Sequence, residues 1–468
     1  MYTAGVDVGA ITAKAAIFND EGLLATALIL TGYNRADAGV ARMLEEKLGH
    51  TISVPEQAQL AGHRRSAHRP GLTMKSGRQI DVQPETPPTR QPIAGSLQSV
   101  VRKLQSAACN LQSKGNPQPT IGFLTAYVPE ELLHAAGLTP VFVFHTREDT
   151  GRARAHLPNS TCWVAGSALD QALSGKLDGL AGLVVAQTCD TMQGLSNIWR
   201  RNVAHIPLLH FGMPQRLDGR ATRTYLLAEL RSLRQRIQAL TGGVISDDAL
   251  WESVALYGNT RALVRRVYAQ AAEFAPPDLY ALVRAAFQTP KETFNEYVTP
   301  LLEQPAIPPD GKSAAPSAHL LLVGSELGDP VLFDVITQAG GCIVGDLLDL
   351  GERYFEGDAA AGSKQRSAPA AGDPLEALCD RMLTRVPTPT KHHAQTNRAA
   401  RLLSLVQKRS ADGVIFARQK FCEPHGFDYA VLADALDRAG VPHLLVELEQ
   451  ASQADQLRTR LEAFLEML

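Results

Sequence analysis

The chain has 468 residues, of which 45% are hydrophobic and 20% charged, an ordinary composition for a globular protein whose length allows roughly three domains. Its formal net charge of −2 argues against a dedicated nucleic-acid-binding protein, which is normally basic. The sequence shows neither a run of about 18 apolar residues nor the layout of a signal peptide, so we expect no membrane association and a cytoplasmic protein. Six scattered cysteines favour metal binding, redox chemistry or simple burial over a disulfide framework.

Residues 1–50 are predicted to form a small unit. The hydrophobic pattern predicts strands over residues 2–8, 13–18 and 23–30, followed by an amphipathic helix over 36–48. The turn at 5–14 reads GVDVGAITAK, in which small residues would let the backbone approach a phosphate. Residues 51–92 are rich in Pro, Arg, Gln and Ser and are predicted to be a linker.

Residues 93–220 are predicted to form a first α/β domain. A leading helix over 93–111 is followed by alternating strands and helices, and this alternation is typical of a parallel, flavodoxin-like sheet. The predicted strands cover 120–124, 140–144, 180–186 and 206–210, and the predicted helices 129–136, 163–173 and 192–201.

Residues 221–315 have a helical period almost throughout and are predicted to be a helical insert. A second α/β domain is predicted over 316–468. Its strands are expected at 320–326, 342–346, 413–417 and 442–447, and its helices at 330–339, 374–383, 399–407, 427–439 and 453–467. The predicted fold class is therefore α/β, with two flavodoxin-like parallel-sheet domains, a helical insert and a small N-terminal β-hairpin remnant.

Three cysteines each stand just ahead of a predicted helix. Cys189 ends one buried strand, before a helix that we expect Asp190 or Thr191 to cap; Cys422 follows a strand of the second domain, and Cys162 precedes the helix at 163–173. Open α/β sheets bind ligands at the carboxyl ends of their strands, and a helix N-terminus favours a thiolate. Because the spacing of these cysteines matches no local zinc or ferredoxin motif, both a shared metal site and plain buried cysteines remain open.

Five stretches resemble the iron–sulfur component shared by 2-hydroxyacyl-CoA dehydratases and ATP-dependent benzoyl-CoA reductases. They read GFLTAYVPEELLHAAG (122–137), LPNSTC (157–162), TCDT (188–191), GSE with RYF (324–326 and 353–355) and KFCEPHGFDY (420–429). The resemblance implies a [4Fe–4S] cluster held between α/β domains by Cys162, Cys189 and Cys422, with one iron left open for substrate. It also implies an acyl-CoA substrate, a homologous second subunit in a heterodimer, and an activator ATPase as electron donor.

The same resemblance assigns expectations to other positions. Asp349 and Thr388 stand where some relatives carry further cysteines, so a double-cubane cluster is not expected, and we interpret Cys109, Cys342 and Cys379 as structural. The turn at 5–14 resembles the first phosphate loop of actin-like ATPases, above all the activator ATPases of the same system. However, Ala10 replaces the expected Ser or Thr, and 50 residues leave no room for the remaining nucleotide fold, which favours a truncated module.

Glu130, Glu131 and His425 are the candidate catalytic residues besides the cluster. The two glutamates could handle protons or bind substrate, but a Glu in a first helical turn is also a common partner of the helix dipole. His425 could donate a hydrogen bond to cluster sulfur or to substrate, or it could cap its helix. Lys420 could contact a CoA phosphate or be a solvated lysine.

Our first hypothesis is the cluster-bearing subunit of a 2-hydroxyacyl-CoA dehydratase, a lyase that eliminates water through a ketyl radical. The alternatives are a subunit of an ATP-dependent benzoyl-CoA reductase and a non-catalytic iron–sulfur protein for electron handling or docking. That the chain is itself an ATPase is a further hypothesis, against which stands the absence of most of a nucleotide-binding fold.

Overall fold

The computed structural model describes the strands at 3–8, 12–19 and 22–30 and residues 95–111, 118–303, 318–357, 372–449 and 454–468. The chain divides into two compact units, residues 1–85 and 86–468. The predicted helix at 36–48 and the predicted linker at 51–92 lie outside the described residues. The domain boundaries that we place inside 93–468 stay a prediction.

The first unit contains three antiparallel strands in the order β1-β2-β3, where the sequence predicts strands. They are β1 (Thr3–Val8), β2 (Thr12–Asn19) and β3 (Gly22–Leu30). The resemblance of the intervening turn to an ATPase phosphate loop stays a prediction.

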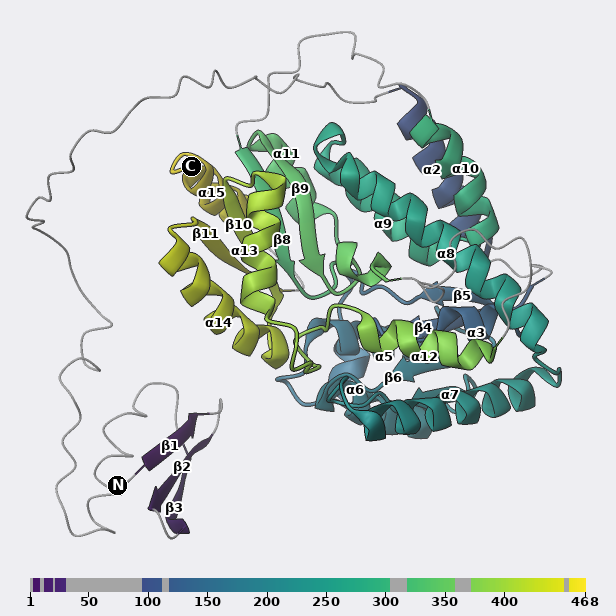
Figure 1. The fold of residues 1–468 in the computed structure, drawn as a ribbon, viewed down its shortest axis with the longest axis horizontal. Helices are drawn as coiled ribbons and strands as arrows, with labels where there is room; N and C mark the ends of the chain where they lie inside the picture. Colours follow the sequence, from purple (N-terminus) through teal and green to yellow (C-terminus); the bar gives the residue numbers. More distant parts are fainter. Residues whose placement is uncertain are drawn as a thin grey trace, which may run out of the picture. The chain divides into compact units, whose positions relative to one another are not determined.

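The second unit contains two parallel four-stranded sheets of identical topology (Figure 1). The first has the order β5-β4-β6-β7 and the second the order β9-β8-β10-β11, so each follows the flavodoxin-like pattern 2-1-3-4. The strands are β4 (Thr120–Leu124), β5 (Thr139–Phe142), β6 (Leu183–Ala186), β7 (Leu208–Phe211), β8 (Ala318–Gly324), β9 (Gly341–Leu348), β10 (Gly413–Gln419) and β11 (His443–Leu448). The predicted α/β class is confirmed.

Each central strand is apolar on both faces because helices cover both faces of its sheet. In the first sheet, Val184 of β6 packs into the large central core, whereas its neighbour Val185 packs against α5 (Trp163–Leu173) and α6 (Asp190–Asn202). In the second sheet, Ile415 of β10 joins the same central core, and Phe416 packs against α13 (Arg398–Arg409) and α14 (Glu423–Ala439). One hydrophobic core thus connects the two sheets.

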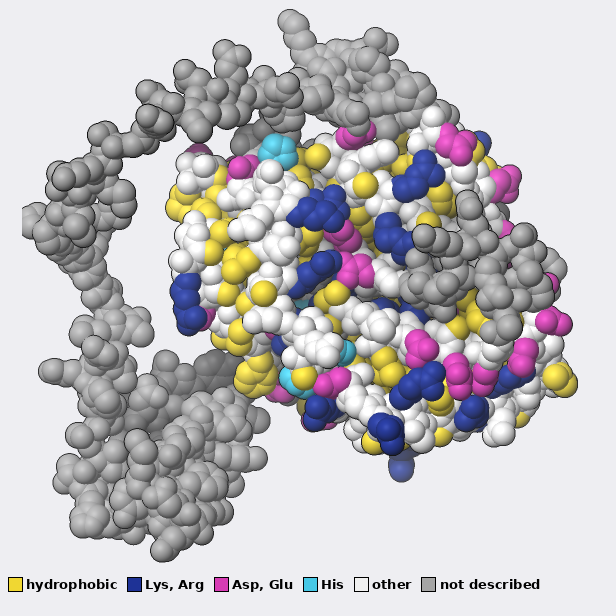
Figure 2. Space-filling view, in the orientation of Figure 1, with side chains coloured by type: hydrophobic (Ala, Val, Ile, Leu, Met, Phe, Trp, Pro, Cys, Tyr) yellow, Lys and Arg dark blue, Asp and Glu magenta, His cyan; other side chains and the backbone are white. Residues whose placement is uncertain are grey.

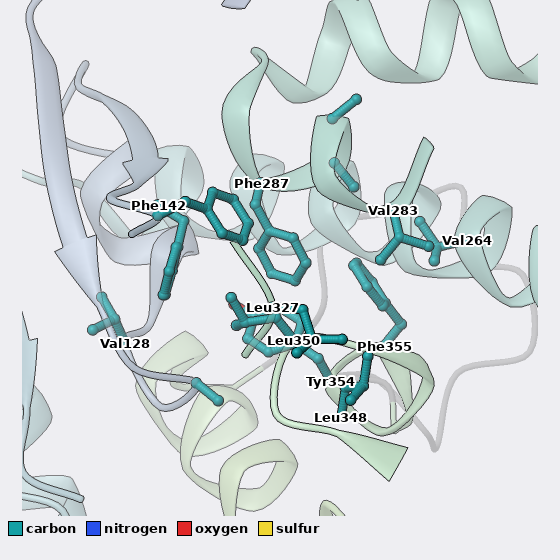
Figure 3. Packing of buried hydrophobic residues seen from close by; sticks show 14 of the residues in the cluster. Val128, Phe142, Val264, Val283, Phe287, Leu327, Leu348, Leu350, Tyr354 and Phe355 are labelled. Atoms are coloured by element: carbon teal, nitrogen blue, oxygen red, sulfur yellow. The ribbon is translucent and has the colours of Figure 1, made fainter. Parts of the chain in front are cut away.

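All four helices of the predicted helical insert contribute residues to the core that connects the two sheets. Its helices are α7 (Arg220–Thr241), α8 (Asp247–Ala269), α9 (Pro276–Gln288) and α10 (Lys291–Glu303). Figure 3 shows Phe287 of α9 between Phe142 of the first sheet and the aromatic pair Tyr354 and Phe355. The ring centroids of Phe287 and Tyr354 are 4.7 Å apart in an edge-to-face arrangement, which adds to the burial energy.

The remaining helices cover the outer faces and link the two halves. They are α2 (Gly95–Leu111), α3 (Glu130–His134), α4 (Gly151–Arg154), α11 (Val331–Gln338), α12 (Pro374–Thr384) and α15 (Ala454–Leu465), with short 3-10 turns η2 (Ala271–Glu273) and η3 (Glu352–Phe355). The helix α12 follows the second sheet's β9 in the chain yet packs against α7, beside the first sheet (Figure 1). One helix of the second half therefore packs on the first half.

Two predicted helix starts are wrong, and the observed starts make Cys189 and Cys422 the N-cap residues of their helices. The helix α6 begins at Asp190, so its N-cap is Cys189 and not Asp190 or Thr191. The helix α14 begins at Glu423, four residues before the predicted start, with Cys422 as its N-cap. Pro424 lies in its first turn, where the fixed φ of proline favours the helix and its missing N–H costs nothing.

Gly324, at the carboxyl end of β8, provides a test of how closely the second sheet is packed. A Cβ at this position would lie 1.9 Å from the carbonyl oxygen of Ala417 in β10. We expect Gly324→Ala to destabilise the protein by about 1–3 kcal/mol or more because the clash is with backbone, measured as a lower urea midpoint. Gly194→Ala is the matched control, because its Cβ would have no atom within 4 Å apart from its chain neighbours and the backbone of its own helix, and alanine favours a helix by up to about 1 kcal/mol. Equal midpoints for the two variants would contradict the close packing.

Candidate cysteine site

Three cysteines are the N-cap residues of three different helices. Cys162 precedes α5, Cys189 precedes α6 and Cys422 precedes α14. The first N–H groups of a helix have no partner inside the helix, and the helix dipole places partial positive charge there. Each sulfur therefore lies near the positive end of a helix.

Cys189 and Cys422 occupy equivalent places in the two sheets. Each follows the third strand of a 2-1-3-4 sheet, β6 or β10, at the switch point where open α/β sheets bind ligands. A non-glycine residue with positive φ lies at each switch point, namely Thr125 after β4 (φ 73°) and Phe421 before Cys422 (φ 64°). Such conformations cost about 1–3 kcal/mol and concentrate at functional sites.

The three thiols lie within electrostatic range of one another. Burial raises the pKa of Cys162 to about 12, and the charges of Cys189 and Glu326 act in the same direction. Burial likewise raises the pKa of Cys422, reinforced by Cys162, Asp349 and Cys189. Backbone N–H groups of Val164 and Ala165 oppose the shift at Cys162, and that of His425 opposes it at Cys422. Burial outweighs these groups and favours the neutral form of Cys162 and Cys422.

A buried acid and a histidine bridge the two halves beside Cys162. Glu326 follows β8, and its Oε1 lies 3.2 Å from Nδ1 of His145, which follows β5. Nε2 of the same imidazole accepts a hydrogen bond from the Gly328 N–H at 3.1 Å. Burial raises the pKa of Glu326, although its hydrogen bond to His145 opposes the shift. The Glu326 carboxyl is thus a buried proton-binding group next to a thiol.

A second histidine–carboxylate pair lies beside Cys422. Nε2 of His425 is 3.0 Å from Oδ2 of Asp349. The other oxygen of this carboxylate, Oδ1, accepts a hydrogen bond from Arg353. Burial alone would raise the pKa of Asp349, but the charges of His425 and Arg353 lower it. The side chain of His425 is therefore paired with Asp349, whereas the backbone N–H of His425 acts on the sulfur of Cys422.

A cavity of about 160 Å³ opens beside Cys162. Its walls come from both halves: the segment around Cys162 and Trp163 on one side, and Lys420, Phe421 and Glu449 on the other. Lys420 forms an ion pair with Glu449 at this wall. The cavity is large enough for a small organic group, and such a group would contact Cys162 in its wall.

Glu130 and Glu131 lie in buried ion pairs. Nζ of Lys291 is 3.0 Å from Oε2 of Glu130, and the Tyr354 hydroxyl donates to the other oxygen. Glu131 accepts a hydrogen bond of 2.6 Å from Arg261, and Arg381 lies 3.9 Å away. These contacts account for both carboxylates structurally, and their predicted catalytic role stays a prediction.

Sequence reasoning missed Glu326, His145 and Lys391 as neighbours of the thiols. Glu326 lies in a quoted motif, but nothing in the sequence pairs it with His145, 181 residues away. The only local signal for Lys391 is its place behind Pro387 and Pro389 in a segment without periodicity. Long-range pairings of this kind follow from packing and leave no pattern in the chain.

The donor set suits an iron–sulfur cluster. Three thiols lie at helix N-termini, and backbone N–H groups favour the ionised form of two of them, which fits the thiolate ligation that such clusters use. Within the described ranges, no three or more His, Cys, Asp or Glu side chains are grouped so as to hold a single metal ion. The fit therefore rests on the chemistry of the three thiols and their helix ends.

Fold and site together define an α/β protein with two flavodoxin-like sheets and a candidate cysteine site near the carboxyl ends of their strands. Comparison with known families narrows this class. Residues 125–468 match the family model described as 2-hydroxyglutaryl-CoA dehydratase, D-component, and the chain belongs to that family.

Several characterised proteins are similar over most of their length. The chain is 26% identical to the (R)-phenyllactyl-CoA dehydratase beta subunit of Clostridium sporogenes over 75% of this chain and 92% of the relative. It is 28% identical to the lactoyl-CoA dehydratase beta subunit of Anaerotignum propionicum (74% and 91%). It is also 26% identical to a subunit of the benzoyl-CoA reductase of Thauera aromatica (80% and 97%). The predicted family is confirmed.

The surface shows no dominant charge on the face in Figure 2, where basic and acidic side chains are interspersed. This agrees with the formal net charge of −2. None of the helices in the described part of the chain has the length and apolar character needed to cross a membrane.

The ion pair of Glu131 predicts a pH-dependent contribution to stability. The pKa of Glu131 lies below its usual 4.5, because the charges of Arg261 and Arg381, with hydrogen bonding, outweigh burial. A depressed folded-state pKa means that the stabilisation is present above about pH 4.5 and is lost as pH falls through the folded pKa. We expect Glu131→Gln to cost about 3–5 kcal/mol at neutral pH and less in acid, measured by urea unfolding.

Glu462→Gln removes an exposed carboxylate from α15 and serves as the control, with an expected change within about 0.5 kcal/mol. A Glu131→Gln protein as stable as the wild type at neutral pH would show that the buried pair contributes nothing.

Proposed function

We propose that the chain is the [4Fe–4S]-bearing subunit of a 2-hydroxyacyl-CoA dehydratase-type system. The observation that carries the proposal is that Cys162, Cys189 and Cys422 are the N-cap residues of three helices and interact electrostatically with one another. The family and the dehydratase subunits among its relatives support it. Three thiolates leave one iron of a four-iron cluster without a protein ligand.

The reaction proposed is the elimination of water from a 2-hydroxyacyl-CoA. A bound cluster would supply a low-potential electron and a Lewis-acidic iron for the leaving hydroxyl. Hydroxide leaves C2 and a proton leaves C3, so the electron that forms the substrate ketyl radical is recovered and no net oxidation occurs. A homologous second subunit and an activator ATPase as electron donor complete the proposed system.

The chain's own residues would position the substrate and exclude water. The cavity beside Cys162 would receive the acyl group, and Lys420 at its wall would face the polar CoA portion. Glu326 and His425 are the candidate groups for proton transfer, since the charge of Glu326 acts on Cys162 and His425 follows Cys422 by three residues. Glu130 and Glu131 would hold the adjoining loop after β4 rather than touch substrate.

Cluster binding is the first test. Purified without oxygen and reconstituted, the full chain should contain about four irons and absorb near 400 nm. We expect Cys162→Ala, Cys189→Ala and Cys422→Ala each to lower the iron content and the absorbance strongly. Cys109→Ala, which changes an exposed thiol, is the control and should retain both. An iron-free, colourless wild-type protein would refute the proposal.

The reaction type is the second test, and it separates the proposal from a subunit of an ATP-dependent benzoyl-CoA reductase, which the similarity to the Thauera aromatica reductase also favours. The reconstituted chain is combined with a second subunit and an activator ATPase from the same genome. We expect ATP-dependent conversion of a 2-hydroxyacyl-CoA to the enoyl-CoA, followed by liquid chromatography. Ring reduction of benzoyl-CoA without this conversion would favour the reductase. A bound cluster without either turnover would favour an electron-handling or docking protein.

A further inference from the structure

Lys391 is a buried lysine at the cysteine edge of the first sheet. Its side chain is 2% exposed, and Nζ donates to the carbonyl oxygens of Gln187 at 2.9 Å and Met213 at 3.1 Å. Gln187 directly follows β6 and precedes Cys189 by two residues, whereas Met213 lies two residues beyond the end of β7. The ammonium group thus joins the ends of two neighbouring strands beside a candidate ligand.

The backbone around Lys391 is held from both halves, so the ammonium has a defined position. His392 exchanges backbone hydrogen bonds of 2.8 Å with Gln215 and Leu217 of the first half. On the other side, Arg398 donates to the Lys391 carbonyl at 3.4 Å and forms an ion pair of 2.6 Å with Asp428 of α14. Lys391 therefore reaches the first sheet from a segment that is also tied to the helix of Cys422.

The two carbonyl contacts do not by themselves require a charged group. A neutral amide can donate two hydrogen bonds, and burying an ammonium is costly unless negative charge compensates it. Burial lowers the pKa of Lys391 to about 8, and a negative sulfur at Cys189 would favour the protonated amine. An amine with this pKa remains mostly protonated at neutral pH.

Acidic groups act on the other two thiols, although the basic side chains of Arg154 and Lys420 also line the cavity beside Cys162. Glu326 acts on Cys162, and Asp349 acts on Cys422. Three thiolates together with two carboxylates would disfavour the addition of an electron, because the reduced site carries one further negative charge. A fixed positive charge beside Cys189 opposes this effect.

We propose that Lys391 is a positioning residue that supplies a fixed positive charge beside Cys189 and thereby stabilises the reduced cluster. The inference rests on the proposed iron–sulfur function. It assigns to the segment between α12 and α13 an electrostatic role at a site formed by other parts of the chain.

The test compares reconstituted full-length wild type, Lys391→Gln and Lys391→Arg by spectroscopic redox titration. Gln keeps hydrogen-bond donors and removes the charge, whereas Arg keeps the charge. We expect Lys391→Gln to lower the ratio of reduced to oxidised cluster at a fixed potential by on the order of tenfold, which equals about 59 mV for a one-electron couple. Lys391→Arg should stay close to the wild type.

Lys291→Gln is the burial-matched control, because Lys291 is also a buried lysine but pairs with Glu130. Its expected effect is lower stability with an unchanged potential. A wild-type reduction potential in Lys391→Gln overturns the inference. Loss of iron in both Lys391 variants also overturns it, because cluster binding would then depend on the shape of the lysine side chain and not on its charge. Iron loss in Gln alone supports it. A wild-type chain that binds no iron refutes the proposed function itself, which is a separate result.

Discussion

The closeness of three cysteines, each at the N-terminus of a helix, is the constraint on which the rest of this structure depends. A helix presents its unpaired N–H groups only at its start, so each cysteine must be an N-cap for its sulfur to face that positive end. Cys162 and Cys189 belong to the first sheet and Cys422 to the second. The site therefore exists only if the carboxyl edges of the two sheets lie close together.

Buried charge restricts how the helices around the loop that follows β4 pack together. Glu131 of α3 pairs with Arg261 of α8 and approaches Arg381 of α12, while Glu130 binds Lys291 and Tyr354. A buried ion pair adds little net stability compared with apolar packing, but removing one partner is strongly destabilising. Such pairs permit few alternative packings, and they lie around the loop that follows β4.

Much of the fold and part of the site could be predicted. Strands such as β6 and β10 are short apolar runs, and their helices carry clear periodicity, so the order of elements and the α/β class follow from the chain. The resemblance motifs identified the family and the three cysteines. Exact helix starts were less accessible: Cys422 caps a helix that begins at Glu423, because proline in the first turn supports a start that the apolar pattern does not mark.

The sequence by itself determined the two repeated strand–helix patterns, the place of each cysteine ahead of a helix, and the family, because these depend on local spacing and motif. Only the tertiary structure decided which charged groups surround the thiols. His145 meets Glu326 across 181 residues and Lys391 meets Gln187 across 204. Contacts at such separations arise from how the sheets pack. The packing energy is distributed over the whole core, so no single segment of the sequence determines these contacts.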